Sequence, residues 1–495
     1  MKKTLKKIAL SICIISFMQI SINAQNEMDA LRFSEIDWQG TARFMGAGKA
    51  FGAVGAEFSA LSTNPASIGL YKKIDITFTP LAISIFKNKS SYNGTTNLGQ
   101  AVRGNIGNAG IVVPLPGISS TQWKKFPIAF GFNRINNFNN TFTIEGRNHG
   151  ATIGSVFAAA AEGLHTKDID FWKTEQWAAW ESYLINPYNP MDSNCTSYYP
   201  AYLGKDMLHK TTVSQRGGID EMLFSFGANF NDKLFFGLTM GIPFINYLED
   251  RTFTETNDKK YYDTCAFRSL KMHDKLTVRA TGINLKLGVI YQPFDFMRVG
   301  VAFHTPTFYG NMRDYLERKI SFTGIDHKGV SFEKEESYTN TFNYSLTTPL
   351  RAMANVAFFI AKRAFISAEY EFADYRMASM YSEDYNFSNE NRAIENKYAF
   401  SHIARIGAEL SITQAFAVRA GYNYVSSPYK SKINDASKHY VSAGFGFKTA
   451  FLYGDLAYTY NTSNENYWMF DPEFVNTVKQ KFITHRIIMT LGVKF

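Results

Sequence analysis

The chain is poor in charged residues, in cysteine and in long apolar runs. Only 19% of its 495 residues are Asp, Glu, Lys or Arg, and only three are cysteine, at positions 13, 195 and 265. Beyond the N-terminal segment, no stretch reaches the roughly 18 consecutive apolar residues that a membrane-spanning helix needs. The sequence therefore excludes a protein built from spanning helices.

Catalytic signatures are absent as well. The chain has no G-x-S-x-G elbow, no H-E-x-x-H motif, no Walker loop and no paired C-x-x-C. The segment GAGK at 46–49 is similar to part of a phosphate-binding loop, but its spacing is wrong and no strand precedes it. A barrel lipase would need a serine beside a histidine, and the sequence pairs none of the histidines at 304, 402, 439 and 485 with a serine. We expect neither an enzyme nor a cofactor or metal.

The first 24 residues have the composition of an export signal. Four lysines precede the apolar run Ile8–Ile22, and Ala24 is followed by a small-residue cleavage point. Cys13 lies inside the apolar run without a lipobox ahead of it, so a lipoprotein is not expected. We predict that residues 1–24 are a signal peptide. An exported chain with no second apolar helix is either soluble or a β-barrel.

Aromatic residues are abundant. Phe, Tyr and Trp make up 16% of the chain, although its mean hydropathy is only −0.20. A transmembrane β-barrel has this mixture, because lipid-facing and lumen-facing residues alternate and cancel in the average. The formal net charge of +9 suits solvated loops or an anionic lipopolysaccharide surface. It lacks the clustered pattern of a nucleic-acid binder, so no nucleic acid is expected.

Alternation of apolar and polar residues predicts the strands. Near the C-terminus, Ile487, Met489 and Leu491 are expected to face one way, and Thr490 and Gly492 the other. The same alternation recurs over 283–291, 366–372, 404–412 and 418–424. Opposite the apolar faces lie charges that we assign to the lumen: Glu369, Glu371, Arg405, Glu409, Arg419 and Asp455. Such charges most often pair with one another or with a plug.

Short and long connections alternate along the chain. Tight turns are expected near 231–232, 292–295, 361–363, 413–414 and 448–450, and long polar links at 147–218, 256–270, 312–339, 382–397, 427–436 and 463–479. Outer-membrane barrels combine short periplasmic turns with long external loops in this way. We predict an all-β fold, a transmembrane antiparallel β-barrel of about 14 strands over residues 74–495.

The stretch Gly40–Leu70 is apolar and rich in Gly and Ala, yet it neither alternates nor suits one long helix. Residues 57–62 can form a helical turn, and Asn64 is suited to cap the next turn, with Pro65 at its first position. We predict that residues 25–73 form a hatch, or plug, inside the lumen. Its site residues are Phe44, Phe51, Phe58, Asn64, Pro65 and Ala66. The alternative is a periplasmic tether that packs loosely.

The widest link, about 147–218, is partly helical in composition. Its 151–161 segment is rich in alanine, and the aromatic residues that follow recur at roughly helical spacing. A helical hairpin that caps the barrel explains this spacing. An outward-facing groove that first captures a hydrophobic ligand also explains it, with Trp172, Trp177 and Trp180 as capture residues. Both can hold at once.

Cys195 and Cys265 are the cysteines that remain after the signal peptide. They fall in two predicted external links, so one disulfide between them is allowed in an oxidising compartment. Two free thiols fit the sequence equally well.

Several segments resemble the outer-membrane transport family that includes the fatty acid transporter FadL and the toluene-uptake protein TodX. The pattern G-T-A-R-x-M-G-x-G-x-A-F-x-A-V-G…S-A-L-x-x-N-P-A runs from Gly40 to Ala66. Further on, Thr348-Pro349 is followed by AEYEFADYR at 368–376, and VRAGYNYVSSP at 418–428 by VSAGFGF and GDLAYTY. The 147–218 link has no counterpart in this resemblance.

The resemblance implies a fourteen-stranded barrel with an N-terminal hatch that includes Asn64, Pro65 and Ala66. Hydrophobic substrates would bind at the external loops, pass to a pocket above the hatch and leave sideways near a kinked third strand. That strand is predicted at 126–142, where the Asn-rich 133–140 segment interrupts pairing. We expect a monomeric channel in a Gram-negative outer membrane, in contact with its lipid and lipopolysaccharide, for passive uptake of long-chain fatty acids or similar molecules. The alternative is protein secretion or surface attachment on the same scaffold.

Overall fold

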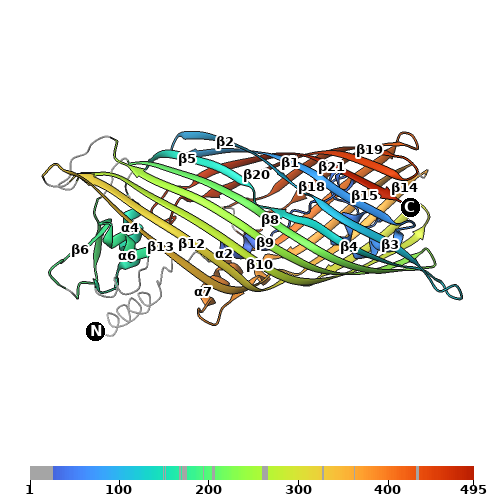
Figure 1. Ribbon diagram of the computed structural model, residues 1–495, viewed down its shortest axis with the longest axis horizontal. Helices are drawn as coiled ribbons and strands as arrows, with labels where there is room; N and C mark the ends of the chain where they lie inside the picture. The colour runs from blue at the N-terminus through green and yellow to red at the C-terminus, as the bar shows by residue number, and fades with distance from the viewer. Residues whose placement is uncertain are drawn as a thin grey trace, which may run out of the picture.

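The computed structural model describes residues 26–495 except 149, 151, 167–168, 170–174, 193, 203–206, 259–265, 326–327, 362 and 431–433. The antiparallel sheet closes on itself because β1 (Asp75–Tyr92) pairs with β21 (Val478–Lys494). Figure 1 shows the resulting long barrel, with the C-terminus at one end. We call this end, which carries the short turns, the turn end, and the opposite one the loop end. The predicted signal peptide lies outside the described residues.

In the described part of the chain, fourteen antiparallel strands form the wall, and several of them are interrupted and carry two β labels. We call each of the fourteen, interrupted or not, a stave. The staves between β1 and β21 are, in order, β2 (Thr95–Asn105) with β3 (Asn108–Pro116), β4 (Trp123–Asn137) with β5 (Asn140–Asn148), β8 (Met207–Phe230), β9 (Leu234–Thr256), β10 (Ala266–Phe294), β11 (Met297–His304) with β12 (Phe308–Ile325), β13 (Ser331–Thr347) with β14 (Arg351–Ile360), β15 (Ala364–Asp374) with β16 (Ser379–Tyr381), β17 (Phe400–Ser411), β18 (Phe416–Val425), β19 (Lys438–Lys448) and β20 (Leu452–Tyr467). The predicted barrel is confirmed.

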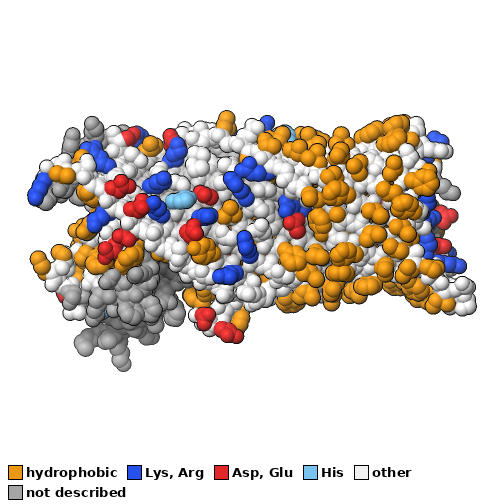
Figure 2. All heavy atoms as spheres, in the orientation of Figure 1, with side chains coloured by type: hydrophobic (Ala, Val, Ile, Leu, Met, Phe, Trp, Pro, Cys, Tyr) orange, Lys and Arg blue, Asp and Glu red, His pale blue; other side chains and the backbone are white. Residues whose placement is uncertain are grey.

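The two faces of the wall follow the predicted alternation. Leu287 and Leu491 are about half exposed on the outside, whereas Lys286 and Thr490 beside them are buried in the lumen. Figure 2 shows the outward apolar side chains as a broad band toward the turn end, with charged side chains on the rim and over the loop half. A band of this kind is the lipid-facing surface of an outer-membrane barrel.

The strands extend further toward the loop end than the sequence predicts. The link expected at 312–339 is mostly paired strand, and β8 begins at Met207 inside the link expected at 147–218. Beyond the band the outward face is polar, so the hydropathy alternation disappears while the backbone pairing continues. Cross-strand ion pairs such as Lys319 with Glu335, at 2.7 Å, replace the apolar outer face there.

The loop end is closed by a cap. It contains α4 (Ile153–Ala161), α6 (Glu175–Glu181), β6 (Ile185–Pro187) and β7 (Tyr198–Pro200), which pack on the inner faces of the long strands. Elsewhere, η3 (Tyr375–Met377) and α7 (Ser388–Lys397) follow β15 and β16. No helix of the described residues is long and apolar enough to cross a membrane.

The N-terminal elements lie in the lumen. They are α2 (Glu27–Ser34), α3 (Ala42–Gly46), η1 (Phe58–Ser62) and η2 (Pro65–Leu70). Helix α3 contacts strands β18–β21, and η2 contacts β4 and β8–β10 on another part of the wall. Figure 1 shows α2 within the barrel outline, near the middle of its length. We use the word hatch for these elements and the segments that join them.

Candidate functional site

Side-chain caps set the local shape of the hatch. Thr41 accepts the Phe44 N–H at the start of α3, and Glu57 accepts the Ser59 N–H at the start of η1. Asn64 accepts the Ala66 N–H at 3.1 Å, and Pro65 occupies the first position of η2. Proline suits this position because it has no N–H to satisfy. Both helical turns predicted from the sequence are present.

The Asn64-Pro65-Ala66 turn packs directly against glycines of the wall. We call a pair of wall glycines that the hatch contacts in this way a glycine seat. Gly237 lies directly opposite Gly288 in the β9–β10 pair, and a Cβ on either one would overlap Asn64 or the Pro65 backbone. A Cβ on Gly227 would overlap Ile68 of η2 in the same way. Glycine is required at these positions because the two backbones touch without a side chain between them.

A second glycine seat holds the loop after α3. Gly407 and Gly421 are cross-strand partners in β17 and β18, and a Cβ on either one would overlap the backbone of Ala47 or Gly48. Gly48 has a φ of 65°, a left-handed conformation that glycine adopts without strain. The hatch therefore lies in backbone contact with two separate groups of strands.

Phe58 occupies a third seat. Gly110 and Gly131 are cross-strand partners in β3 and β4, and the Phe58 ring lies over both, in the space that a side chain on either one would fill. Phe58 is 2% exposed and packs with Leu61, Ile68 and Val112. These three seats make the hatch a tightly fitted plug rather than a loose tether.

Hydrogen bonds from wall side chains complete the docking. The Asn64 amide donates to Asn355 Oδ1 at 3.0 Å, and His304 Nε2 lies 2.8 Å from the carbonyl oxygen of Thr63. Arg298 donates to the carbonyl oxygen of Val54 at 2.7 Å. Each bond satisfies a polar group that has left water.

Ion pairs join the hatch to the wall and the lumen charges to one another. Glu409 accepts two 2.9 Å hydrogen bonds from Arg43 of the hatch and one from Arg419 of the wall, which also pairs with Asp455. Arg405 pairs with both Glu369 and Glu371. All six charges that the sequence assigned to the lumen are paired, as predicted.

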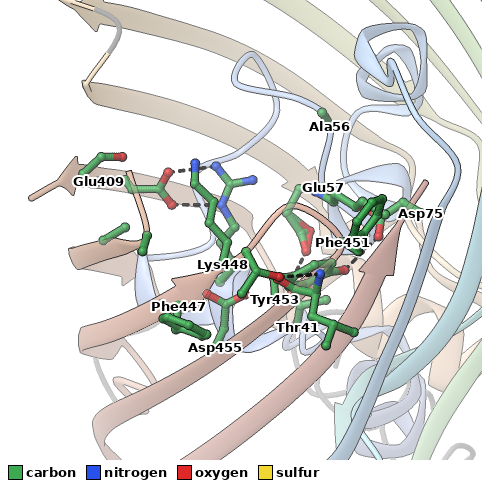
Figure 3. A pocket seen from close by; sticks show the side chains of 18 of the residues that line it. Thr41, Ala56, Glu57, Asp75, Glu409, Phe447, Lys448, Phe451, Tyr453 and Asp455 are labelled. Atoms are coloured by element: carbon green, nitrogen blue, oxygen red, sulfur yellow. Dashed lines mark hydrogen bonds and ion pairs between the residues drawn. The ribbon is translucent and has the colours of Figure 1, made fainter. Parts of the chain in front are cut away.

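A cavity of about 210 Å³ lies between the hatch and the turn ends of the neighbouring strands (Figure 3). Its lining combines charged and apolar side chains, and Figure 3 shows Glu57, Glu409 and Asp455 around it together with Phe447 and Phe451. Burial raises the pKa of Glu57 to about 7, although Thr41 Oγ1 donates to its carboxylate and Arg43 lies nearby. The cavity therefore borders both the ion pairs of the hatch and apolar side chains at the turn ends of the strands.

The loop side of the hatch carries an aromatic cluster, with the Arg32 guanidinium 4.9 Å from the centre of the Tyr247 ring. Phe33 of α2, Tyr247 of β9 and Phe138 form a ring cluster, with centroid distances of 5.2 to 5.8 Å. Phe138 lies where the third stave breaks between β4 and β5, and the pairing register with β8 shifts just before it. The predicted interruption in the Asn-rich segment is confirmed. It places an aromatic contact between the lumen and the wall.

The predicted site residues differ in how the structure places them. Phe44, Phe51 and Phe58 are buried within the hatch and its seats, and Phe51 packs on Phe365 of the wall. Trp177 and Trp180 pack against the cap cluster, which agrees with a capping role. Trp172 and Cys265 lie outside the described residues. Cys195 Sγ lies 3.4 Å from the carbonyl oxygen of Ser197, and its pairing with Cys265 stays a prediction.

The sequence did not reveal which wall residues contact the hatch. The seat glycines, Asn355 and His304 were not assigned to this site. Glycines that recur on the lumen-facing positions of neighbouring strands were the available signal, but which hatch residue meets which glycine depends on the closed barrel. The described residues contain no cluster of His, Cys, Asp and Glu that could hold a metal ion.

These features define an outer-membrane-type β-barrel with a plugged lumen. Two solved structures share the fold: a Pseudomonas aeruginosa FadL homologue (13% identity, 93% of this chain and 99% of that chain, TM-score 0.51) and a deltaS2 mutant of the TodX monoaromatic hydrocarbon channel (12%, 92% and 98%, TM-score 0.51). The Pseudomonas putida toluene transporter TodX aligns over 93% of this chain and 99% of its own, at 13% identity and a TM-score of 0.49. No family model and no curated protein matches the sequence. The chain has the FadL-type fold.

Proposed function

We propose that this chain is a channel in a Gram-negative outer membrane for passive uptake of hydrophobic small molecules such as long-chain fatty acids. The hatch fills the lumen with backbone contacts, which supports a route other than an open water-filled pore. A FadL homologue and a monoaromatic hydrocarbon channel share the fold, and a hydrophobic cargo is consistent with both.

The break in the third stave carries the proposal. Among the described residues no backbone ladder joins β2 to β5, although the Glu145 N–H of β5 donates to Asn97 Oδ1 of β2 at 2.9 Å. A wall without a ladder can part there at little cost in hydrogen bonds. Phe138 lies just before the start of β5, and its ring packs on Phe33 of the hatch and Tyr247 of β9, which supports an aromatic path from the lumen toward this gap.

Binding needs no energy source other than burial of the solute. At about 25 cal/mol per Å² of apolar surface, a solute that buries about 200 Å² gains about 5 kcal/mol. Movement of the hatch, which is held by its glycine seats and the Arg43–Glu409 pair, would let the solute pass sideways into the membrane.

Uptake of radiolabelled oleate by cells that lack other fatty acid uptake tests the proposal. The Phe138→Asp variant is expected to lower uptake at least fivefold at equal amounts of folded barrel, because it places a charge on the route. The matched control is Phe474→Asp, a half-buried aromatic in the loop-end cap, which should leave uptake unchanged. Cells with the wild-type chain that take up no more oleate than empty cells would overturn the proposal.

A hatch deletion tests the moving part. Removing residues 44–61 should leave a barrel that assembles but takes up oleate at a changed rate. Failure of the barrel to assemble would mean that the wall needs this stretch in order to fold, which contradicts a hatch that moves independently. Secretion or surface attachment is the second candidate function: Trp177 and Trp180 pack onto the cap, but Tyr188 and Met191 of the same link are exposed and can meet a partner.

A further inference from the structure

Three Tyr–His pairs lie on the outside of the barrel at the same height along its axis. The hydroxyls of Tyr370, Tyr422 and Tyr458 lie 2.6, 2.8 and 2.7 Å from Nδ1 of His402, His439 and His485, respectively. Each histidine lies nine residues from the turn end of its strand, which is Ser411, Lys448 or Lys494. At about 3.4 Å per residue and a tilt of about 40°, this level is about 23 Å from the turn end.

This level is the loop-side boundary of the apolar band, because such bands are about 25 Å tall and are edged by aromatic residues. Below His485 on the same strand, Ile487 and Leu491 are exposed outward. External loops are the long ones in such barrels, so the boundary faces the outer leaflet. Each tyrosine bonds Nδ1, and Nε2 of each histidine ring has no hydrogen bond to the described residues.

Four lysines project outward just beyond His485, on the two strands that close the barrel. Lys89 of β1 lies directly opposite Lys481 of β21 in the register. Lys87 and Lys479 lie two residues away on either side of this pair, and all four are exposed. Lys481 is four residues beyond His485, which places its Cα atom about 10 Å past the boundary.

Three outward lysines elsewhere on the loop half have acidic partners. Lys210, Lys275 and Lys319 each face a glutamate on the neighbouring strand, at 3.0, 3.8 and 2.7 Å. Within the described residues, none of the four lysines on β1 and β21 has an ion-pair partner. Like charges directly opposite each other in a sheet are destabilising. An anion from outside the chain would remove that repulsion.

We propose that this surface binds a phosphorylated lipid of the outer leaflet, namely lipid A of lipopolysaccharide. Directly opposite residues have Cβ atoms about 5 Å apart, so one phosphate can bridge Lys89 and Lys481. Ile85 lies opposite His485 at the base of the lysine patch, which suits the acyl chains below the phosphate. A soluble polyanion would gain nothing from this apolar base. The proposal does not depend on transport.

Binding of bisphosphorylated lipid A to the purified full chain in detergent, with EDTA present, tests it. The double variant Lys89→Gln/Lys481→Gln is expected to bind at least tenfold more weakly than the wild type. The matched control Lys275→Gln/Lys319→Gln removes two outward lysines that have partners, and should change binding less than twofold. Equal losses in both variants would overturn the proposal.

Two further measurements make the test specific. Lipid A should raise the apparent Tm of the wild type but not that of Lys89→Gln/Lys481→Gln. Without lipid, the variant should be at least as stable as the wild type, because it has lost a contact between like charges. Dephosphorylated lipid A should bind at least tenfold more weakly. If it binds as well as the phosphorylated form, or if phosphatidylglycerol vesicles show the same dependence on the lysines, the assignment to lipid A phosphate is wrong.

Discussion

Asn64 and Asn355 are 291 residues apart in the chain, yet the Asn64 amide donates a 3.0 Å hydrogen bond to Oδ1 of Asn355 inside the barrel. Both side chains are buried. Asn64 Oδ1 also accepts the Ala66 N–H. One side chain therefore starts the η2 turn and ties it to β14, so local shape and docking of the hatch depend on the same residue.

Replacing Asn64 should loosen the hatch. In Asn64→Ala the η2 turn loses its cap and Asn355 loses its donor, and such losses cost about 1–3 kcal/mol. Hydrogen exchange of residues 57–70 should become faster, while the strands stay protected. The exposed Asn464→Ala is the control and should change nothing. Unchanged exchange in the first variant would show that this bond does not hold the hatch.

Adding one methyl group to a glycine seat should push the hatch away from the wall. A Cβ at Gly237 overlaps the Pro65 backbone, so Gly237→Ala should destabilise the docked hatch by about 1–3 kcal/mol. Gly104→Ala, on β2, meets nothing within 4 Å and should be neutral or slightly stabilising. Protease sensitivity of the hatch and heat-induced gel shifts of the barrel distinguish the two. Equal behaviour of the variants would contradict the glycine seat.

The lipid-facing assignment predicts the effect of a charge. Leu287→Arg or Leu491→Arg should destabilise the barrel by about 2–4 kcal/mol if these positions face the middle of the bilayer. Ile118→Arg, at an exposed turn-end position, should cost less than about 1 kcal/mol. Urea titrations in lipid vesicles measure the differences. Near-neutral effects at both leucines would mean that the apolar band does not face lipid.

The ion pair between the hatch and the wall should be energetically coupled. A double-mutant cycle with Arg43→Met and Glu409→Gln is expected to give about 1–2 kcal/mol, because two 2.9 Å hydrogen bonds join partly buried groups. The exposed Lys275–Glu317 pair, at 3.8 Å, is the control and should give less than about 0.5 kcal/mol. Similar coupling energies for the two pairs would contradict a docking role for Arg43.

Glu57 should make the hatch sensitive to pH. Its folded pKa of about 7 exceeds the ordinary value of 4.5, so the folded state holds the proton more tightly than the unfolded state. The contribution of Glu57 to stability is therefore fully present below pH 4.5 and is lost as the pH rises through 7. In Glu57→Gln the protection factors of the hatch amides, which are the exchange rates corrected for the intrinsic pH dependence, should no longer change between pH 5 and 7.5. A pH dependence that survives this substitution must come from another group.

Much of this protein could be predicted from the sequence because the deciding signals are local. Alternation along each strand assigned Leu491 to the outside and Glu371 to the lumen, and both assignments are correct. The Asn-Pro pair at 64–65 marked a helical turn whatever its surroundings. The same local signal fails where the outer face turns polar, so the sequence predicts a link over 312–339, where β12 and β13 are paired strands.

Only the tertiary structure decided which residues meet. The sequence by itself determined the alternating strands of a barrel and the charged side chains that face its lumen, and it predicted the hatch. It could not pair Asn64 with Asn355, seat Pro65 against Gly237 or place Lys89 opposite Lys481, because those contacts depend on the register and closure of strands hundreds of residues apart. A shift of one residue in register turns every side chain of a strand to the other face, so contacts across the lumen are fixed only when the barrel closes.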